Sequence, residues 1–462
     1  MARRGPDPAS RPERVLDPEA VGSLQSLVLP SLVAEELDGI PCYFEDFEQV
    51  KARWGQDAKR LLFHLEANAQ ELARQFERPG MPRSTRERIK AYRRASLEQR
   101  DALKRIVAAL EPDKIPLPAF FEHFTGKGDK PSALLEHFAN LHRDWSWGGA
   151  ENSASLEAIT GLLPPGYAVG KLLVPGAGAC RLAHDLHQQL KPEATIATEV
   201  NPLLFLCAKR ILAGGTVNLY ELPALPVDSA SYAVKRQLRA PAGALKGDFQ
   251  LVLSDMGVPC FNPGAFDTIV TSWFIDVVPI DIHVLFPILN SLLKPGGLWL
   301  NLGPTMYNGP LPRFYSSEET LEAVAECGFS CEAQFQRYFS HLHSPASAHH
   351  RVERLLGFRA RKEQSVAVPA RSPTESWGEV PDWFTDRSLP VELGVDLETI
   401  AMMHRAAAET LAGVDGKRTL AELAELVASR LNLPGHFTQE FTRNTLLSVI
   451  EWAQSNPTRT RD

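Results

Sequence analysis

The sequence lacks the features that mark membrane-spanning and secreted proteins. It contains no run of about 18 uncharged apolar residues, and the segment from Met1 to Pro8 has none of the apolar stretch that a secretory signal needs. Its six cysteines occur singly rather than with a Cys-x-x-Cys spacing, so we expect free and mostly buried thiols instead of a disulfide framework or a zinc ribbon. These absences predict a cytoplasmic protein.

An excess of positive charge is also lacking. The net charge of −7 argues against a dedicated nucleic-acid binder, because neutralising phosphates requires a positive surface. Apolar residues make up 44% of the chain and charged residues 23%, the balance of an ordinary globular protein. A chain of 462 residues exceeds what one hydrophobic core supports, so we expect a main domain with one or two appendages. Small molecules or peptides are the expected partners.

Residues 1–115 are predicted to form a helical N-terminal region. The first 15 or so residues are rich in Arg, Pro and Asp and are expected to be a frayed arm. From about Ala20 to Leu110, apolar residues recur at helical spacing among many charges. Prolines at positions 112, 116 and 118 then break the pattern, which places a domain boundary there.

The middle of the chain, residues 116–363, alternates short β-rich apolar runs with helical stretches. This alternation predicts an α/β, Rossmann-like domain, in which a parallel sheet carries helices on both faces. A ligand of such a domain binds beyond the carboxyl ends of the strands, near the point where the strand order reverses. The strands are expected at 171–175, 195–199, 249–255, 266–272 and 298–302.

The strongest local motif is a Gly-x-Gly turn after the first of these strands. Gly176 and Gly178 allow the backbone to approach a nucleoside closely, and the helix that follows favours a carboxylate or phosphate at its N-terminus. A glycine turn alone is often merely a tight turn. The third glycine of the dinucleotide fingerprint is replaced by Cys180-Arg181, which disfavours a nicotinamide-dependent oxidoreductase, the third of the functions that we consider.

Acidic residues at the ends of the following strands favour an adenosyl ligand. Glu199 lies about twenty residues after the turn, where its carboxylate can accept hydrogen bonds from both ribose hydroxyls. Asp255 ends the third strand and is placed to hold an adenine amino group, while Arg181 is placed to meet the methionyl carboxylate. The fourth strand runs into an aromatic loop that ends at Asp276.

The stretch from about Leu141 to Lys362 resembles the carnosine N-methyltransferase family, which belongs to the class I methyltransferases that use S-adenosylmethionine. The most particular motif is Leu292-Leu-Lys-Pro-Gly-Gly-Leu-Trp-Leu-Asn-Leu-Gly-Pro. A looser match lies upstream, around Arg74-Gln75-Phe76. The other matching motifs are Arg143-Asp-Trp-Ser, Leu173-Val-Pro-Gly-Ala-Gly and Trp273-Phe-Ile-Asp.

This resemblance implies methyl transfer to an imidazole nitrogen, with Asp276 as the catalytic residue. Its carboxylate would accept the hydrogen bond of the second ring N–H and stabilise the developing imidazolium. The residues expected to bind S-adenosylmethionine are Gln75, Arg78, Gly176, Gly178, Arg181, Glu199, Asp255, Met256 and Ser272. The residues expected to contact the acceptor are Trp273, Phe274, Tyr307, Asn308, His343 and His350.

Departures from the family leave the acceptor open. Asn308 stands where the family has a histidine, and the family's tyrosine-rich segment is replaced by 340–351, which is rich in histidine. Another imidazole compound, a peptidyl histidine, or a different nitrogen or oxygen acceptor therefore fits as well as carnosine. The histidines of that segment lack a cysteine or acidic cluster, so no metal is predicted. Asp276 has an alternative role as a helix N-cap, and Arg143-Asp-Trp could simply lock the helical region onto the core.

Residues 364–380 read as a linker, and residues 381–456 resemble the PqqD-like winged-helix domains that bind leader peptides in peptide-modifying systems. The matching segments are Pro381-Asp-Trp-Phe and the stretch that begins at Asp415, in which Thr419 and Glu422 form a capping box. Such a domain would hold a leader peptide by strand addition, whereas the alternative is a small helical cap for packing or dimerisation. A non-catalytic peptide-binding or chaperone module on a methyltransferase scaffold remains the second functional hypothesis.

Overall fold

The computed structural model divides the chain into two compact units, residues 1–377 and residues 378–462. Within the described residues, no helix is long and apolar enough to cross a membrane. The residues that the structure describes are 24–115, 132–307, 314–369, 395–432 and 435–455.

A nine-stranded sheet forms the centre of the first unit. Its strand order is β1-β2-β7-β4-β3-β8-β9-β11-β10, and all pairs from β2 to β9 are parallel. The order reverses at β3, with β4 and β7 on one side and β8 and β9 on the other. The predicted Rossmann-like class I methyltransferase fold is thereby confirmed. The central strands are β3 (Lys171–Val174), β4 (Ala194–Glu199), β7 (Phe249–Ser254), β8 (Phe266–Ser272) and β9 (Leu293–Gly303).

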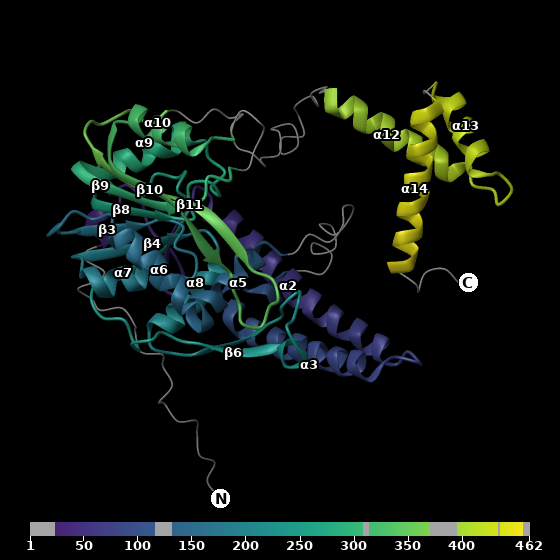
Figure 1. The fold of residues 1–462 in the computed structure, drawn as a ribbon, viewed down its shortest axis with the longest axis horizontal. Coiled ribbons are helices and arrows are strands. Elements are labelled where there is room, and N and C mark those ends of the chain that lie inside the picture. The colour runs from purple at the N-terminus through teal and green to yellow at the C-terminus, as the bar shows by residue number, and fades with distance from the viewer. Residues whose placement is uncertain (1–23, 116–131, 308–313, 370–394, 433–434, 456–462) are drawn as a thin grey trace, which may run out of the picture. The chain divides into compact units, whose positions relative to one another are not determined.

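Helices cover both faces of this sheet (Figure 1). Successive residues of β3 show why: Leu172 packs into the hydrophobic cluster on one face and Leu173 into the cluster on the other, and both side chains are fully buried. Burying each such side chain stabilises the fold by about 1.5–3 kcal/mol. The covering helices are α6 (Gly149–Thr160), α7 (Arg181–Leu190), α8 (Pro202–Leu212), α9 (Ile282–Leu292) and α10 (Ser317–Glu326).

The helical N-terminal region is present and belongs to the first compact unit. Its two long helices, α2 (Phe47–Phe76) and α3 (Arg83–Ile106), form a hairpin that projects away from the sheet (Figure 1). The region also contains a short hairpin of strands, β1 (Glu35–Leu37) and β2 (Ile40–Tyr43), which extends the sheet beside β7. The region therefore contributes to the sheet as well as to the helices.

Two antiparallel strands, β10 (Phe329–His341) and β11 (Arg351–Lys362), complete the sheet. β11 pairs with β9 only from Leu356 onward, so the part of the ribbon nearest its tip continues beyond the carboxyl end of β9. The tip loop docks through backbone hydrogen bonds onto residues 225–227, in the connection between β5 (Val217–Glu221) and β6 (Val234–Leu238) of a small second sheet. The ribbon thus reaches the edge of the sheet where a ligand is expected.

The second unit contains α12 (Val395–Ala412), α13 (Leu420–Leu431) and α14 (Gly435–Ser455). The predicted capping box of Thr419 and Glu422 is present at the start of α13. Within the described part of this unit no strand accompanies the helices. The motif Pro381-Asp-Trp-Phe lies outside the described residues, so the PqqD-like domain stays a prediction.

Candidate active site

The Gly-x-Gly turn lies directly at the carboxyl end of β3 and is tied to the end of β4. Gly176 and Gly178 have φ values of +58° and +56°, a region that favours glycine. The Gly178 N–H donates to Oε2 of Glu199 at 2.9 Å, while Oε1 accepts from the N–H groups of Val200 and Asn201. These three bonds fix the direction of the carboxylate and leave about one lone pair on Oε2 for a ligand hydroxyl.

Opposing effects act on the Glu199 carboxyl. Burial raises its pKa, while the three backbone N–H donors favour the ionised form. A Cβ added at Gly178 would meet no atom within 4 Å, so this part of the turn borders open space. A fixed acceptor beside an open glycine backbone fits the ribose edge of an adenosyl ligand.

Gly176 connects the turn to the loop after β8. A Cβ at this position would lie 2.3 Å from the ring of Phe274, so the aromatic ring packs directly on the glycine backbone. Phe274 is buried and stands two residues before Asp276. The structure therefore brings the predicted cofactor turn and the predicted acceptor loop together.

The motif Arg143-Asp-Trp-Ser-Trp forms one turn of π-helix that contacts several parts of this edge. The indole Nε1 of Trp145 donates to the carbonyl of Ala179 in the glycine turn at 2.7 Å. Arg181, the first residue of α7, donates to the carbonyl of Asp144 at 2.7 Å and pairs with Asp185. Arg181 lies beside the turn, as predicted, but much of its guanidinium already bonds to protein atoms.

Trp273 follows β8 in the left-handed conformation, with φ of +48°, which is uncommon for a bulky residue. Its ring stacks on His341 with centroids 5.4 Å apart, and its Nε1 donates to Glu353 at 3.0 Å. Arg143 lies 6.0 Å from the indole centroid and 3.3 Å from Nδ1 of His341. Burial, with the positive charges of Arg143 and Arg351, lowers the pKa of His341 to about 3, so this ring is neutral. Backbone strain of this kind concentrates at functional sites.

Asp276 is buried at the carboxyl edge of the sheet. Its Oδ2 accepts from the backbone N–H of Met306 at 3.3 Å, and its Oδ1 has no hydrogen-bond partner among the described residues. Burial raises the pKa of the carboxyl from 3.8 to about 6, although the N–H of Met306 favours ionisation, and the negative charge of Glu353 raises the pKa further. In this site the helix N-cap is Asp281, which caps α9, rather than Asp276. An orphaned buried acceptor needs a partner, which a substrate N–H would provide.

The remaining cofactor candidates from the strand ends lie at the same edge. Asp255 directly follows β7, and its Oδ1 accepts from the N–H of Gly257 at 2.7 Å. Met256 is buried, with its sulfur 4.0 Å from the hydroxyl of Thr198 in β4. Ser272 is the last residue of β8 and pairs with β9 in the sheet register. These positions match the predicted crevice.

Other predicted residues lie elsewhere. Gln75 hydrogen-bonds Glu71 within α2, and Arg78 is exposed at the far end of the α2–α3 hairpin, which projects away from the sheet (Figure 1). The structure does not bring these two side chains to the glycine turn, because the end of α2 packs against α3. Arg143, which was not predicted as a site residue, lies at the site beside Trp273 and His341. The Arg143-Asp-Trp-Ser motif was the sequence signal that could have identified it.

The residues predicted to contact the acceptor do not all lie together. Tyr307 is buried, and its hydroxyl bonds Thr320 of α10 at 3.1 Å, so it helps to hold the chain beside Asp276. Asn308 lies outside the described residues. His343 and His350 stack on each other with centroids 4.2 Å apart in the tip loop, and both are exposed. Among the described residues, no three His, Cys, Asp or Glu side chains form a group that could hold a metal ion.

Comparison with known proteins gives a partial match. A family model described as carnosine N-methyltransferase matches residues 122–337. Carnosine N-methyltransferases of Mus musculus and Rattus norvegicus are 28% and 27% identical over 245 residues, which are 46% of this chain. The chain spans 57% of the length of these curated relatives. A solved S-adenosylmethionine-dependent methyltransferase of Methanosarcina mazei is 12% identical, with a TM-score of 0.32, over 44% of this chain and 96% of that one.

Proposed function

We propose that this chain is an S-adenosylmethionine-dependent N-methyltransferase whose acceptor is an imidazole nitrogen. The observation that carries the proposal is the buried Asp276 carboxylate, with one unpartnered oxygen, beside Trp273 at the carboxyl edge of a methyltransferase fold. The similarity to carnosine N-methyltransferases supports the same reaction class.

The residues around the glycine turn fit the cofactor. Gly176 and Gly178 offer backbone that a nucleoside can approach, Glu199 offers a fixed acceptor for a ribose hydroxyl, and Asp255 lies where an adenine amino group would be held. When bound, S-adenosylmethionine supplies a methyl group on a sulfonium that is already a strong electrophile. The work left to the protein is placement of the acceptor, which contributes much of the rate in such reactions.

Asp276 performs that placement. Its free Oδ1 accepts the N–H of the acceptor ring, which selects the tautomer whose other nitrogen carries the attacking lone pair. When the methyl group passes to the ring nitrogen, the sulfur–methyl bond of the cofactor would break and leave S-adenosylhomocysteine; the ring would become an imidazolium, whose new charge the adjacent carboxylate would stabilise. Trp273, three residues before Asp276 in the same loop, stacks on the neutral ring of His341, and the two rings would form a flat wall for the acceptor.

The acceptor is carnosine, another small imidazole compound or a peptidyl histidine. The substitution at Asn308 and the replacement of the family's tyrosine-rich segment favour an acceptor other than carnosine. The sequence resemblance of residues 381–456 adds a proposed leader-peptide site, which would raise the local concentration of a peptidyl acceptor.

The test compares Asp276→Ala with the unchanged protein in two assays. Mass spectrometry measures the gain of one methyl group on carnosine, on N-acetylhistidine and on histidine peptides, and isothermal titration measures S-adenosylmethionine binding. We expect turnover to be lost while cofactor affinity changes by less than about tenfold, or about 1.4 kcal/mol.

Equal loss of turnover and cofactor affinity would remove the assigned role of Asp276. If the unchanged protein binds neither S-adenosylmethionine nor its demethylated product but does bind peptide, the non-catalytic scaffold replaces the enzyme. These two results are distinguishable because titration is read separately from methyl transfer.

A further inference from the structure

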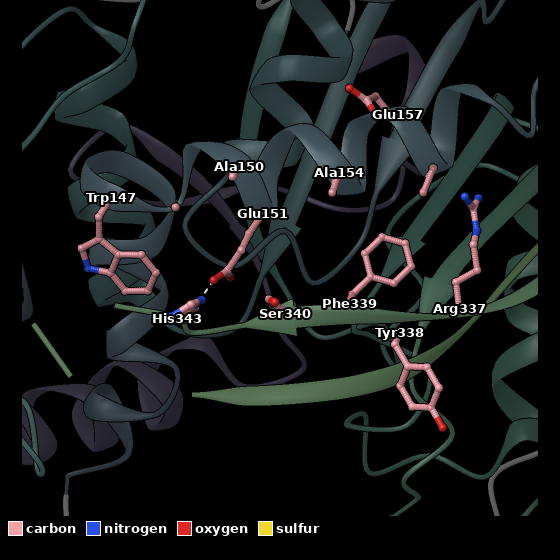
Figure 2. A pocket seen from close by; sticks show the side chains of 12 residues that line it. Trp147, Ala150, Glu151, Ala154, Glu157, Arg337, Tyr338, Phe339, Ser340 and His343 are labelled. Atoms are coloured by element: carbon pink, nitrogen blue, oxygen red, sulfur yellow. Dashed lines mark hydrogen bonds between the residues drawn. The ribbon is translucent and has the colours of Figure 1, made fainter. Parts of the chain in front are cut away.

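A cavity of about 650 Å³ lies between α6 and the outer strand β10, apart from the cofactor turn (Figure 2). This volume falls in the range of sites that hold ligands, about 300–1,000 Å³. Its walls are one face of α6, the four consecutive residues 337–340 of β10, and Trp147 at one end. We call this cavity the α6–β10 groove.

The two walls leave room for an extended chain. α6 presents alanines at 150, 154 and 158, which are spaced one helical turn apart and keep this face of the helix shallow. Among the described residues, β10 is the last strand in the sheet order and pairs with β11 alone. An outer strand of 13 residues presents backbone donors and acceptors on its open side, which is the arrangement to which peptides add as a further strand.

Two charged side chains that line the groove form no ion pair within the described residues. The guanidinium carbon of Arg337 lies 4.1 Å from the centroid of the Phe335 ring. Neither Arg337 nor Glu157 of α6 forms an ion pair with a described residue. Figure 2 shows Arg337 and Glu157 toward the end of the groove opposite Trp147. Because side chains of an extended chain alternate in direction, one peptide segment can present an acidic group to Arg337 and a different side chain to α6.

The other end of the groove leads to the acceptor site. His343 lines the groove, and its backbone N–H donates to Oε1 of Glu151 at 2.8 Å (Figure 2). Two residues earlier in the chain, His341 ends β10 and stacks on Trp273. Trp147 likewise ends the helical turn that begins with Arg143, the residue that contacts His341. A chain lying in the groove therefore leads toward His341 and Trp273, and Trp273 lies in the loop that carries Asp276.

We propose that the α6–β10 groove binds an extended polypeptide segment that flanks the methylated histidine, with an acidic side chain of that segment at Arg337. The inference rests on the proposed function and narrows its acceptor to a peptidyl histidine. Main-chain pairing with β10 supplies affinity, and the charge at Arg337 supplies preference among sequences.

The test uses the full chain with S-adenosylhomocysteine and short synthetic peptides. Each labelled peptide has one central histidine among Thr and Val residues, with Glu placed at each other position in turn, and a matched series carries Lys instead. Fluorescence anisotropy measures binding. Arg337→Glu should weaken the best Glu peptide by at least about tenfold and strengthen its Lys counterpart, and Ala154→Phe should weaken both. The control is Arg354→Glu, which changes an exposed arginine of the same ribbon outside the groove and should bind as the unchanged protein does.

In the two groove variants, turnover of the peptide relative to turnover of carnosine should fall in parallel with peptide binding. Peptide binding that neither groove substitution alters would overturn the proposal, as would methylation of small imidazoles by a protein that binds no peptide. Sedimentation that shows a dimer broken by Arg337→Glu would also overturn it, because the occupant would be a second copy. Groove-dependent peptide binding without any methyl transfer would instead support the groove while contradicting the proposed reaction.

Discussion

Replacing Asp276 by Asn should stabilise the protein, and the gain should depend on pH. The folded chain raises the pKa of this carboxyl from 3.8 to about 6, so the native state binds a proton that the unfolded chain releases between about pH 4 and about pH 6. Stability is therefore lost as pH rises through this window. The loss follows from the two pKa values as about 1 kcal/mol at pH 4.5 and about 3 kcal/mol at pH 7.5. An uncharged amide of the same shape does not carry this cost.

Urea unfolding at the two pH values measures the effect. Any pH-independent cost of the amide cancels in the comparison, so the stability difference between Asp276→Asn and the unchanged protein should grow by about 2 kcal/mol from pH 4.5 to pH 7.5. The control Glu322→Gln removes an exposed carboxyl on α10 and should give the same difference at both pH values. A difference for Asp276→Asn that does not grow with pH would refute the assignment of a strained, buried carboxylate.

Three further predictions concern the site. Gly176→Ala should cost about 1–3 kcal/mol of stability and more than about tenfold in cofactor affinity, because its Cβ would meet an aromatic ring at 2.3 Å. Thermal unfolding should show a smaller loss for Gly296→Ala, which shares a positive φ but meets no atom within 4 Å. Arg143→Ala should lower turnover by at least about tenfold, whereas Arg78→Ala should leave turnover unchanged. A larger loss for Arg78→Ala than for Arg143→Ala would instead support the cofactor role that the resemblance around Arg74-Gln75-Phe76 implies. At saturating cofactor, kcat/KM for the acceptor should rise through about pH 6 as Asp276 ionises, and a flat profile there would contradict this role.

The parallel core could be predicted because its strands are buried on both faces. The runs at 171–175, 195–199, 249–255 and 266–272 match β3, β4, β7 and β8 to within one residue at each end. Buried strands are nearly continuous in apolar residues, which makes them visible in a single sequence. The fifth strand, β9, begins five residues earlier than expected, because Leu293 already pairs with Phe266 of β8; the register is irregular between there and Leu298, where Pro-Gly-Gly has low strand propensity.

The outer strands escaped prediction for the opposite reason. β10 is mostly exposed: only Phe329 and His341 at its two ends are buried and only residues 333, 335 and 339 are half-buried, so its sequence resembles a polar loop. β1 and β2 are three and four residues long and form a short hairpin, of which only β2 pairs with β7. Both outer hairpins join the sheet through strands far away in the sequence, β7 and β9, and local patterns do not encode such pairing.

The site divides along the same line. Residues at strand ends, such as Glu199 and Asp276, were identifiable because the fold class predicts which edge of the sheet they occupy. His341, Arg143 and Glu353 meet at Trp273 only through the β10–β11 ribbon, so their association could not be derived before that ribbon was placed.

The helical turn that begins at Arg143 has a structural role and also contacts the candidate site. Trp145 donates a hydrogen bond to the glycine turn, and the carbonyl of Asp144 accepts one from Arg181. The segment therefore holds the glycine turn and the start of α7 in place. Its first residue, Arg143, at the same time contacts His341 at the acceptor wall. A π-helical turn widens the backbone at this point, and Gly148 accommodates it, since a Cβ there would lie 2.4 Å from the carbonyl oxygen of Arg143. One segment thereby sets the spacing between the two halves of the site.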